Sequence, residues 1–145
     1  MRTRRRGAGL LLALVTTAVL ASACGGGTSG VSGATRLHVD ATVTRAGTTV
    51  HVLGTLRCGP GPSRGTGDLV TRAAAACRRL DRDPRILDRV GGADRLCSQI
   101  YGGPQQARIT GTVAGRAIDV TIRRTDGCGV ADWNALEWLL GAPER

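Results

Sequence analysis

Apolar and polar residues alternate along two pairs of short segments, a pattern that predicts strands with one buried face. The segments of the first pair are joined at Ala46-Gly47, and their apolar positions are Leu37, Val39, Ala41 and Val43, then Val50, Val52, Leu56 and Cys58. The segments of the second pair are joined around Ala114-Gly115-Arg116, and their apolar positions are Ile109 and Val113, then Ile118, Val120 and Ile122. Each pair therefore predicts a β-hairpin.

The segment between the two hairpins changes to helical spacing. A first helix is predicted from Asp68 onward, with an apolar face formed by Val70, Ala73, Ala74, Cys77 and Leu80. That spacing turns Cys77 toward the core. A second, short helix is predicted to begin with Asp83 as its N-cap and Pro84 as its first residue, and to end at Gly91-Gly92.

The C-terminal residues from Asp132 to Leu140 fit two structures. Trp133, Leu136 and Leu140 have helical spacing, yet a closing strand is also possible. Together the predicted elements define an α+β fold, an antiparallel β-sheet with one or two helices packed on one face. The predicted domain covers residues 36–141, and residues 142–145 form a tail.

The first 23 residues have the plan of a secretory signal peptide, an arginine-rich start followed by an apolar stretch from Ala8 to Ala21. The stretch is shorter than the roughly 20 apolar residues of a membrane-spanning helix. The next residues, Leu20-Ala21-Ser22-Ala23-Cys24, resemble a bacterial lipobox, in which Cys24 receives a diacylglyceryl group. Simple cleavage that leaves Cys24 unmodified is the alternative. Residues 24–35 then form a lipidated cysteine and a Gly/Ser-rich tether, so we expect a secreted protein or a lipoprotein on the outer face of the cell membrane.

Composition narrows the possible partners. The chain has 20 basic and 11 acidic residues, every basic one is arginine, and the net charge is +9. Loss of residues 1–23 removes four arginines and leaves about +5. Only 2% of the residues are aromatic, so the stacking platforms used to bind single-stranded nucleic acid are scarce. We expect no nucleic-acid partner, although salt-sensitive adhesion to teichoic or nucleic acid is a further hypothesis based on charge alone.

Motifs of catalysis and metal binding do not stand out in the sequence. His38 and His51 occupy strand positions predicted to face water, and Ser98 has no G-x-S-x-G context. The sequence also contains no H-E-x-x-H motif and no phosphate-binding loop. We therefore expect neither an enzyme nor a cofactor or metal site.

Four cysteines remain in the exported domain besides Cys24: Cys58, Cys77, Cys97 and Cys128. Four thiols in an exported domain of this size indicate two disulfides, for which three pairings are possible. A zinc site is the rival interpretation, but the cysteine spacings contain no C-x-x-C pair. With so few aromatic residues to bury, the domain is expected to depend on the disulfides for stability.

Taken in order, four parts of the chain resemble the Streptomyces subtilisin inhibitor family. They are Cys58-Gly59-Pro60-Gly61-Pro62-Ser63, Ala75-Ala76-Cys77-Arg78-Arg79-Leu80, Cys97-Ser98-Gln99-Ile100-Tyr101 and Cys128. The resemblance covers about Leu37 to Leu140. It implies disulfides between Cys58 and Cys77 and between Cys97 and Cys128, and a homodimer that pairs sheet faces. It also implies a loop that inhibits an extracellular serine protease.

By position in that family, Gln99–Ile100 is the reactive bond, and Ser98 and Tyr101 are its neighbours in the loop. Family members commonly have Pro at the position of Ser98, and an Asp-Pro pair where this chain has Gly102-Gly103-Pro104. Two glycines are expected to soften the loop. Gln99 carries no charge for the acidic pocket of a trypsin-like protease, so the resemblance favours a subtilisin-like target.

Two hypotheses therefore follow from the sequence. The first is a lipid-anchored inhibitor of subtilisin-like serine proteases. The second is a non-inhibitory envelope lipoprotein that keeps the fold as a binding or structural module. They differ in whether the segment from Ser98 to Gly103 protrudes as an extended loop or packs against the domain.

Overall fold

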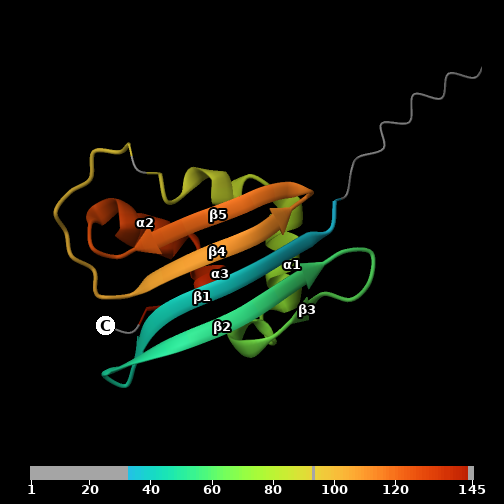
Figure 1. Cartoon of the computed structure of the whole chain (residues 1–145), viewed down its shortest axis with the longest axis horizontal. Coiled ribbons are helices and arrows are strands. Elements are labelled where there is room, and N and C mark those ends of the chain that lie inside the picture. Colours follow the sequence, from blue (N-terminus) through green and yellow to red (C-terminus); the bar gives the residue numbers. More distant parts are fainter. Residues whose placement is uncertain (1–32, 93, 144–145) are drawn as a thin grey trace, which may run out of the picture.

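A five-stranded antiparallel sheet forms one layer of the computed structural model, which describes residues 33–92 and 94–143. The strands lie side by side in the order β3-β2-β1-β4-β5 (Figure 1). Their bounds are β1 Thr35–Arg45, β2 Thr48–Cys58, β3 Arg64–Gly65, β4 Gln106–Val113 and β5 Arg116–Arg123. Both predicted hairpins are present, because β1 pairs with β2 and β4 pairs with β5.

Each hairpin turns through two residues with positive φ. Ala46 and Gly47 have φ of 48° and 75°, and Ala114 and Gly115 have φ of 49° and 80°. Two consecutive residues of this kind form the two-residue turn whose twist matches that of the flanking strands. The turns fix the register, which runs from Thr35 opposite Cys58 to Arg45 opposite Thr48 in the first hairpin. The apolar positions of each strand therefore share one face.

The helices pack on that apolar face and leave the other face of the sheet open (Figure 1). They are α1 Ala73–Arg82, α2 Gly127–Ala135 and α3 Glu137–Leu140, with 3-10 turns η1 Gly67–Leu69 and η2 Ile86–Arg89. The largest side chain with no exposed surface is Trp133 of α2, and Leu136 and Leu139 are buried with it. The α+β architecture predicted from the sequence is confirmed, and its C-terminal segment is helical rather than a closing strand.

Two helix predictions need correction. Helix α1 begins at Ala73 rather than near Asp68, so Val70 is 62% exposed and Ala76 takes the inward position expected of Ala74. The predicted second helix is only the 3-10 turn η2, and Asp83 does not cap it. Asp83 instead ends α1, and its carboxylate forms an ion pair with Arg89. The capping prediction failed because the Asp83 carboxylate is paired with Arg89 and because η2 is a single short turn.

Both disulfides connect a strand or loop to a helix. Cys58 at the end of β2 is bonded to Cys77 of α1, and Cys97, in the segment before β4, is bonded to Cys128 of α2. Of the three pairings that the sequence allows, this is the one implied by the resemblance. His38 and His51 are exposed, as the strand pattern predicted.

The predicted signal peptide, Cys24 and most of the predicted tether lie outside the described residues. In the part of the chain that is described, no helix has the length and apolar character to cross a membrane. The buried side chains of this part all lie between Thr35 and Leu140, as do both disulfides. The described residues therefore contain one hydrophobic core.

The two ends of the sheet carry different parts of the molecule. At one end β1 begins at Thr35 and β2 ends at Cys58; at the other, β1 ends at Arg45 and β4 begins at Gln106. The chain enters the domain at the first end, whereas the segment before β4 arches out beyond the second (Figure 1). Strand β1, with 11 residues, separates the two ends by about 35 Å.

Removal of one disulfide tests how far this small core depends on it. The double variant Cys58→Ala/Cys77→Ala is expected to lower the free energy of unfolding by about 3 kcal/mol, because a loop of this length is no longer closed in the unfolded chain. Denaturant unfolding of the oxidised exported domain measures the change. A loss below about 1 kcal/mol would contradict the dependence.

Candidate functional site

The segment Arg95–Gly103, called the exposed loop below, joins η2 to β4 without any helix, strand or turn. It arches beyond the end of the sheet beside α2 (Figure 1). Its side chains reach into solvent: Leu96, Ile100 and Tyr101 are 106%, 62% and 66% exposed, and Ser98 and Gln99 are exposed as well. An irregular segment with exposed apolar side chains needs anchors elsewhere to keep a defined shape, and the structure provides them on both sides.

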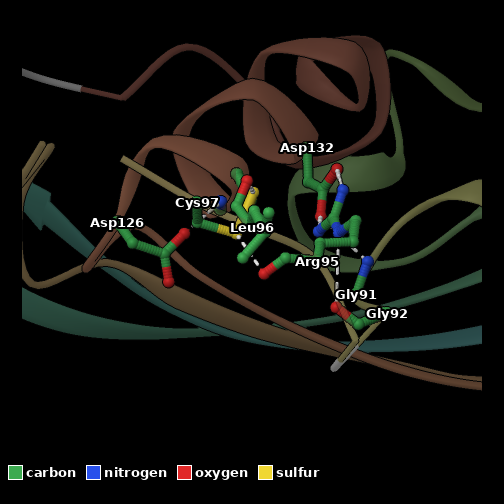
Figure 2. The surroundings of a disulfide bond; sticks show 9 residues. Gly91, Gly92, Arg95, Leu96, Cys97, Asp126 and Asp132 are labelled. Atoms are coloured by element: carbon green, nitrogen blue, oxygen red, sulfur yellow. Dashed lines mark hydrogen bonds and ion pairs between the residues drawn. A yellow bond between two sulfur atoms is a disulfide. The ribbon is translucent and has the colours of Figure 1, made fainter. Parts of the chain in front are cut away.

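The first anchor is an ion pair at the start of the exposed loop. The guanidinium of Arg95 donates to both carboxylate oxygens of Asp132 in α2, with Nη1 2.9 Å from Oδ1 (Figure 2). The same carboxylate accepts the backbone N–H of Gly91 at 2.9 Å, and Arg95 Nε donates to the Gly92 carbonyl at 3.3 Å. Asp132 is only 5% exposed. Its hydrogen bond raises the pKa of Arg95, and the fork geometry fixes the direction of the chain.

The second anchor is the disulfide between Cys97 and Cys128, whose Cα atoms are 5.3 Å apart. Cys128 lies in the first turn of α2, and Asp126 caps that helix by accepting the Gly129 N–H at 2.9 Å. Asp126 and the two sulfur atoms lie close enough together to resemble a metal-ligand group. Because the two sulfurs are bonded to each other, neither is a thiolate that could bind a metal ion. The cluster is therefore structural.

Ser98 rests on the start of α2. Its carbonyl accepts the N–H of Gly127 at 2.9 Å. A Cβ atom at Gly127 would lie 2.1 Å from the Ser98 Oγ, so a larger residue there would require the Ser98 hydroxyl to turn away. The backbone of Ser98 is therefore held at the start of α2, while its side chain stays exposed.

The third anchor holds the far side of the exposed loop. Gly102 donates its N–H to the Arg124 carbonyl at 2.8 Å, directly after β5. A Cβ atom on Gly102 would be 2.3 Å from Val130 Cγ2, so glycine is needed for close packing here. The expectation that glycines soften the loop is therefore wrong at Gly102. The buried Gln105 continues the attachment, because its Oε1 accepts from Arg124 Nη1 at 3.0 Å.

Between the anchors, Gln99, Ile100 and Tyr101 extend into solvent. Their backbone N–H and C=O groups make no hydrogen bond to other residues in the described ranges 33–92 and 94–143. Unpaired backbone groups on an extended, held segment can pair with a strand of another protein, as in β-strand addition. The exposed loop is therefore a short segment that is held on both sides and has unpaired backbone groups around Gln99.

The structure thus brings the sequence-predicted residues together in one loop: Ser98, Gln99, Ile100, Tyr101, Cys97 and, through the disulfide, Cys128. The anchoring residues Arg95, Asp132 and Arg124 were not predicted. One signal in the sequence could have indicated them: Asp132, an acidic residue directly before the apolar Trp133 in the C-terminal segment. A carboxylate there is expected to need a buried partner, but the sequence does not show which arginine provides it.

Comparisons with known proteins add no relative to this description. No family model matches the chain, and no curated protein matches it. The geometry of the exposed loop and the resemblance found in the sequence are therefore the two indications of function.

Neutralising Asp132 tests whether the ion pair holds the exposed loop. Asp132→Asn keeps the side-chain shape but removes the charge, and is expected to lower the free energy of unfolding by about 2 kcal/mol. A non-target protease is also expected to cleave the loop faster. The matched control is Asp119→Asn, which breaks the exposed pair with Arg108 on the open face of the sheet and should change neither property appreciably. Equal effects of both substitutions would rule out a special role for Asp132.

Proposed function

We propose that this chain is an exported, lipid-anchored inhibitor of subtilisin-like serine proteases, with Gln99–Ile100 as its reactive bond. The observation that supports this most is the exposed loop itself, which extends at Gln99, Ile100 and Tyr101 yet is fixed to α2 and to the end of β5 on its two sides. A protruding, extended loop is the feature that separates an inhibitor from a non-inhibitory module of the same fold.

In the proposed mechanism the loop binds the protease as a substrate does, but both ends of the cleaved bond stay held in the active site. The protease serine attacks the Gln99 carbonyl, and the peptide bond to Ile100 breaks to give an acyl-enzyme and a free amino group. On the acyl side, Cys97 and Ser98 remain attached to α2. On the other side, Gly102 remains bonded to Arg124. The Ile100 amine therefore stays beside the acyl carbon and re-forms the bond before water replaces it.

Preorganisation is what gives such a loop its affinity. A flexible peptide loses conformational entropy when a protease orders it, whereas a loop held at both ends has lost most of that entropy on folding. The anchors lie two residues before Gln99 and three residues after it, at Cys97 and Gly102. Only a few residues between the anchors remain free, so little conformational entropy is lost when a protease binds the loop.

Gln99 determines the class of protease in this proposal. Its side chain is exposed and uncharged, so it cannot form an ion pair at the bottom of an acidic, trypsin-like pocket. It is long enough to enter a broad, shallow pocket of the subtilisin type.

The anchor at Cys24 gives the inhibitor a location. Only eight residues, 25–32, separate that anchor from the start of the described domain. The chain then enters the domain at Thr35, and the exposed loop lies at the opposite end of the sheet. A lipid on Cys24 would therefore keep the inhibitor at the outer face of the membrane, where it meets proteases outside the cell.

Titration of subtilisin with the oxidised exported domain tests the inhibition. We expect inhibition at one inhibitor per protease. Gln99→Gly is expected to weaken it by about 100-fold or more, because the central side chain is lost and the loop gains flexibility. The control Ser63→Gly, in the Pro/Gly-rich segment away from the loop, should leave inhibition unchanged. Absence of inhibition, or rapid degradation of the domain, would favour the non-inhibitory envelope lipoprotein.

The variant Gln99→Arg tests the assigned position within the same assay. An arginine there supplies the positive charge that a trypsin-like pocket binds, so inhibition of trypsin is expected to appear. Subtilisin inhibition should persist to within about tenfold, because a broad pocket accepts both side chains. If trypsin inhibition appears only when another loop residue is changed to arginine, the reactive bond has been assigned to the wrong place.

Lipid attachment is tested separately in the producing cell. Cys24→Ser removes the acceptor thiol, and the protein is expected to move from the membrane fraction to the medium. Ser22→Ala keeps a small residue before the cysteine and should leave the protein in the membrane fraction. Release of the unmodified chain into the medium would contradict lipid anchoring without affecting the inhibitor assay.

A further inference from the structure

Three arginines lie in a row on the open face of the sheet. The register places Arg36 of β1 directly opposite Arg57 of β2, and Arg57 directly opposite Arg64 of β3. All three side chains are exposed. Neighbouring strands are about 4.8 Å apart, so three positive charges are held side by side within a short distance. This set is called the arginine row below.

The fold does not explain the arginine row. Like charges directly opposite one another on adjacent strands destabilise a sheet. Arg78, Arg79 and Arg123 also have no ion pair in the described part of the chain, but they do not form a row. Five other arginines of the domain have acidic partners: Arg45, Arg89, Arg95, Arg108 and Arg116. Within residues 33–92 and 94–143, the guanidinium groups of the row make no hydrogen bond or ion pair, and the one hydrogen bond that a side chain makes to a row residue goes to the backbone carbonyl of Arg57. Three adjacent guanidinium groups are therefore left available for an external anion.

The arginine row also borders a hollow. A shallow depression of about 210 Å³ at this end of the sheet is lined by all three arginines and by the Pro/Gly-rich segment from Gly59 to Pro62. An anion that enters it can be contacted by more than one guanidinium. Guanidinium groups bind phosphate oxygens through paired hydrogen bonds and are weakly hydrated, so phosphate groups suit this site.

The position of the row in the molecule favours one source of phosphate. Arg36 is the second residue of β1, at the end where the chain arrives from the tether and Cys24. The exposed loop lies at the other end of the sheet (Figure 1). Basic groups beside a membrane anchor are attracted to anionic lipids, and the anchor keeps their local concentration high.

We propose that Arg36, Arg57 and Arg64 bind the phosphate groups of anionic phospholipids, which sets the domain on the membrane with the exposed loop pointing outward. The orientation rests on the proposed lipid anchor at Cys24, whereas the binding itself needs only the row. A tether alone lets the domain tumble at the surface, but contact through the row holds one end down. The row and the reactive bond lie near opposite ends of β1, so contact through the row leaves the exposed loop at the far end of the sheet.

Vesicle sedimentation of the exported domain carrying Cys24→Ser tests the row without any attached lipid. The domain is expected to bind vesicles of phosphatidylglycerol and phosphatidylcholine, and not vesicles of phosphatidylcholine alone. Added salt should weaken the binding. The variant Arg36→Gln/Arg57→Gln/Arg64→Gln is expected to reduce the partition coefficient by at least about tenfold, since each arginine near an anionic surface contributes.

The matched control removes three other exposed arginines, Arg78, Arg79 and Arg123, by substitution with glutamine. It changes the net charge by the same amount and should reduce vesicle binding by less than about threefold. Circular dichroism and subtilisin titration of both triple variants establish that the fold and the exposed loop are intact. Loss of inhibition with normal vesicle binding would overturn the proposed function and leave the row as assigned.

Several results would overturn the assignment of the row to lipid. Equal loss of binding in the two triple variants would make net charge the cause. Equal binding to vesicles with and without phosphatidylglycerol would exclude the phosphate groups of anionic lipids. Binding of soluble polyphosphate with no binding to either vesicle would assign the row to a soluble polyanion.

Discussion

The exposed loop depends on helix α2, which holds it through three residues within one short stretch of chain. Gly127 donates its N–H to the Ser98 carbonyl, and Cys128 forms the disulfide with Cys97. The carboxylate of Asp132 forms the ion pair with Arg95. One contact is a backbone hydrogen bond, one is covalent and one is an ion pair at a carboxylate that is 5% exposed. If α2 moved, all three contacts would move together. The rigidity of the loop therefore depends on how firmly α2 is packed against the core.

The position of α2 is in turn fixed by its packing against a core that is poor in aromatic residues. Trp133 follows Asp132 directly, has no exposed surface, and donates its indole N–H to the Gly141 carbonyl at 3.2 Å. Neighbouring positions on one helix therefore serve two purposes, since Trp133 fixes α2 in the core and Asp132 fixes the loop to α2. The sheet gives the molecule two different ends, because the chain enters the domain at one end and the exposed loop lies at the other.

Elements with strong local patterns could be predicted from the sequence. Alternation revealed both hairpins, and the resemblance implied the cysteine pairing that the structure has. The ion pair between Arg95 and Asp132 joins residues 37 positions apart, and no local rule selects one arginine among many for that carboxylate. Gly102 misled the prediction because a glycine that permits close packing on Val130 looks, in sequence, like one that confers flexibility.

The most direct test of the held loop is whether a protease can re-form its bond. The exported domain is cleaved at Gln99–Ile100, where the disulfide from Cys97 to Cys128 keeps the two pieces joined. It is then incubated with a catalytic amount of subtilisin and followed by mass spectrometry. If α2 and β5 hold both new ends in place, intact chain reappears until a stable mixture of cleaved and intact forms is reached. Cleaved chain that stays cleaved, or is degraded further, would contradict the account.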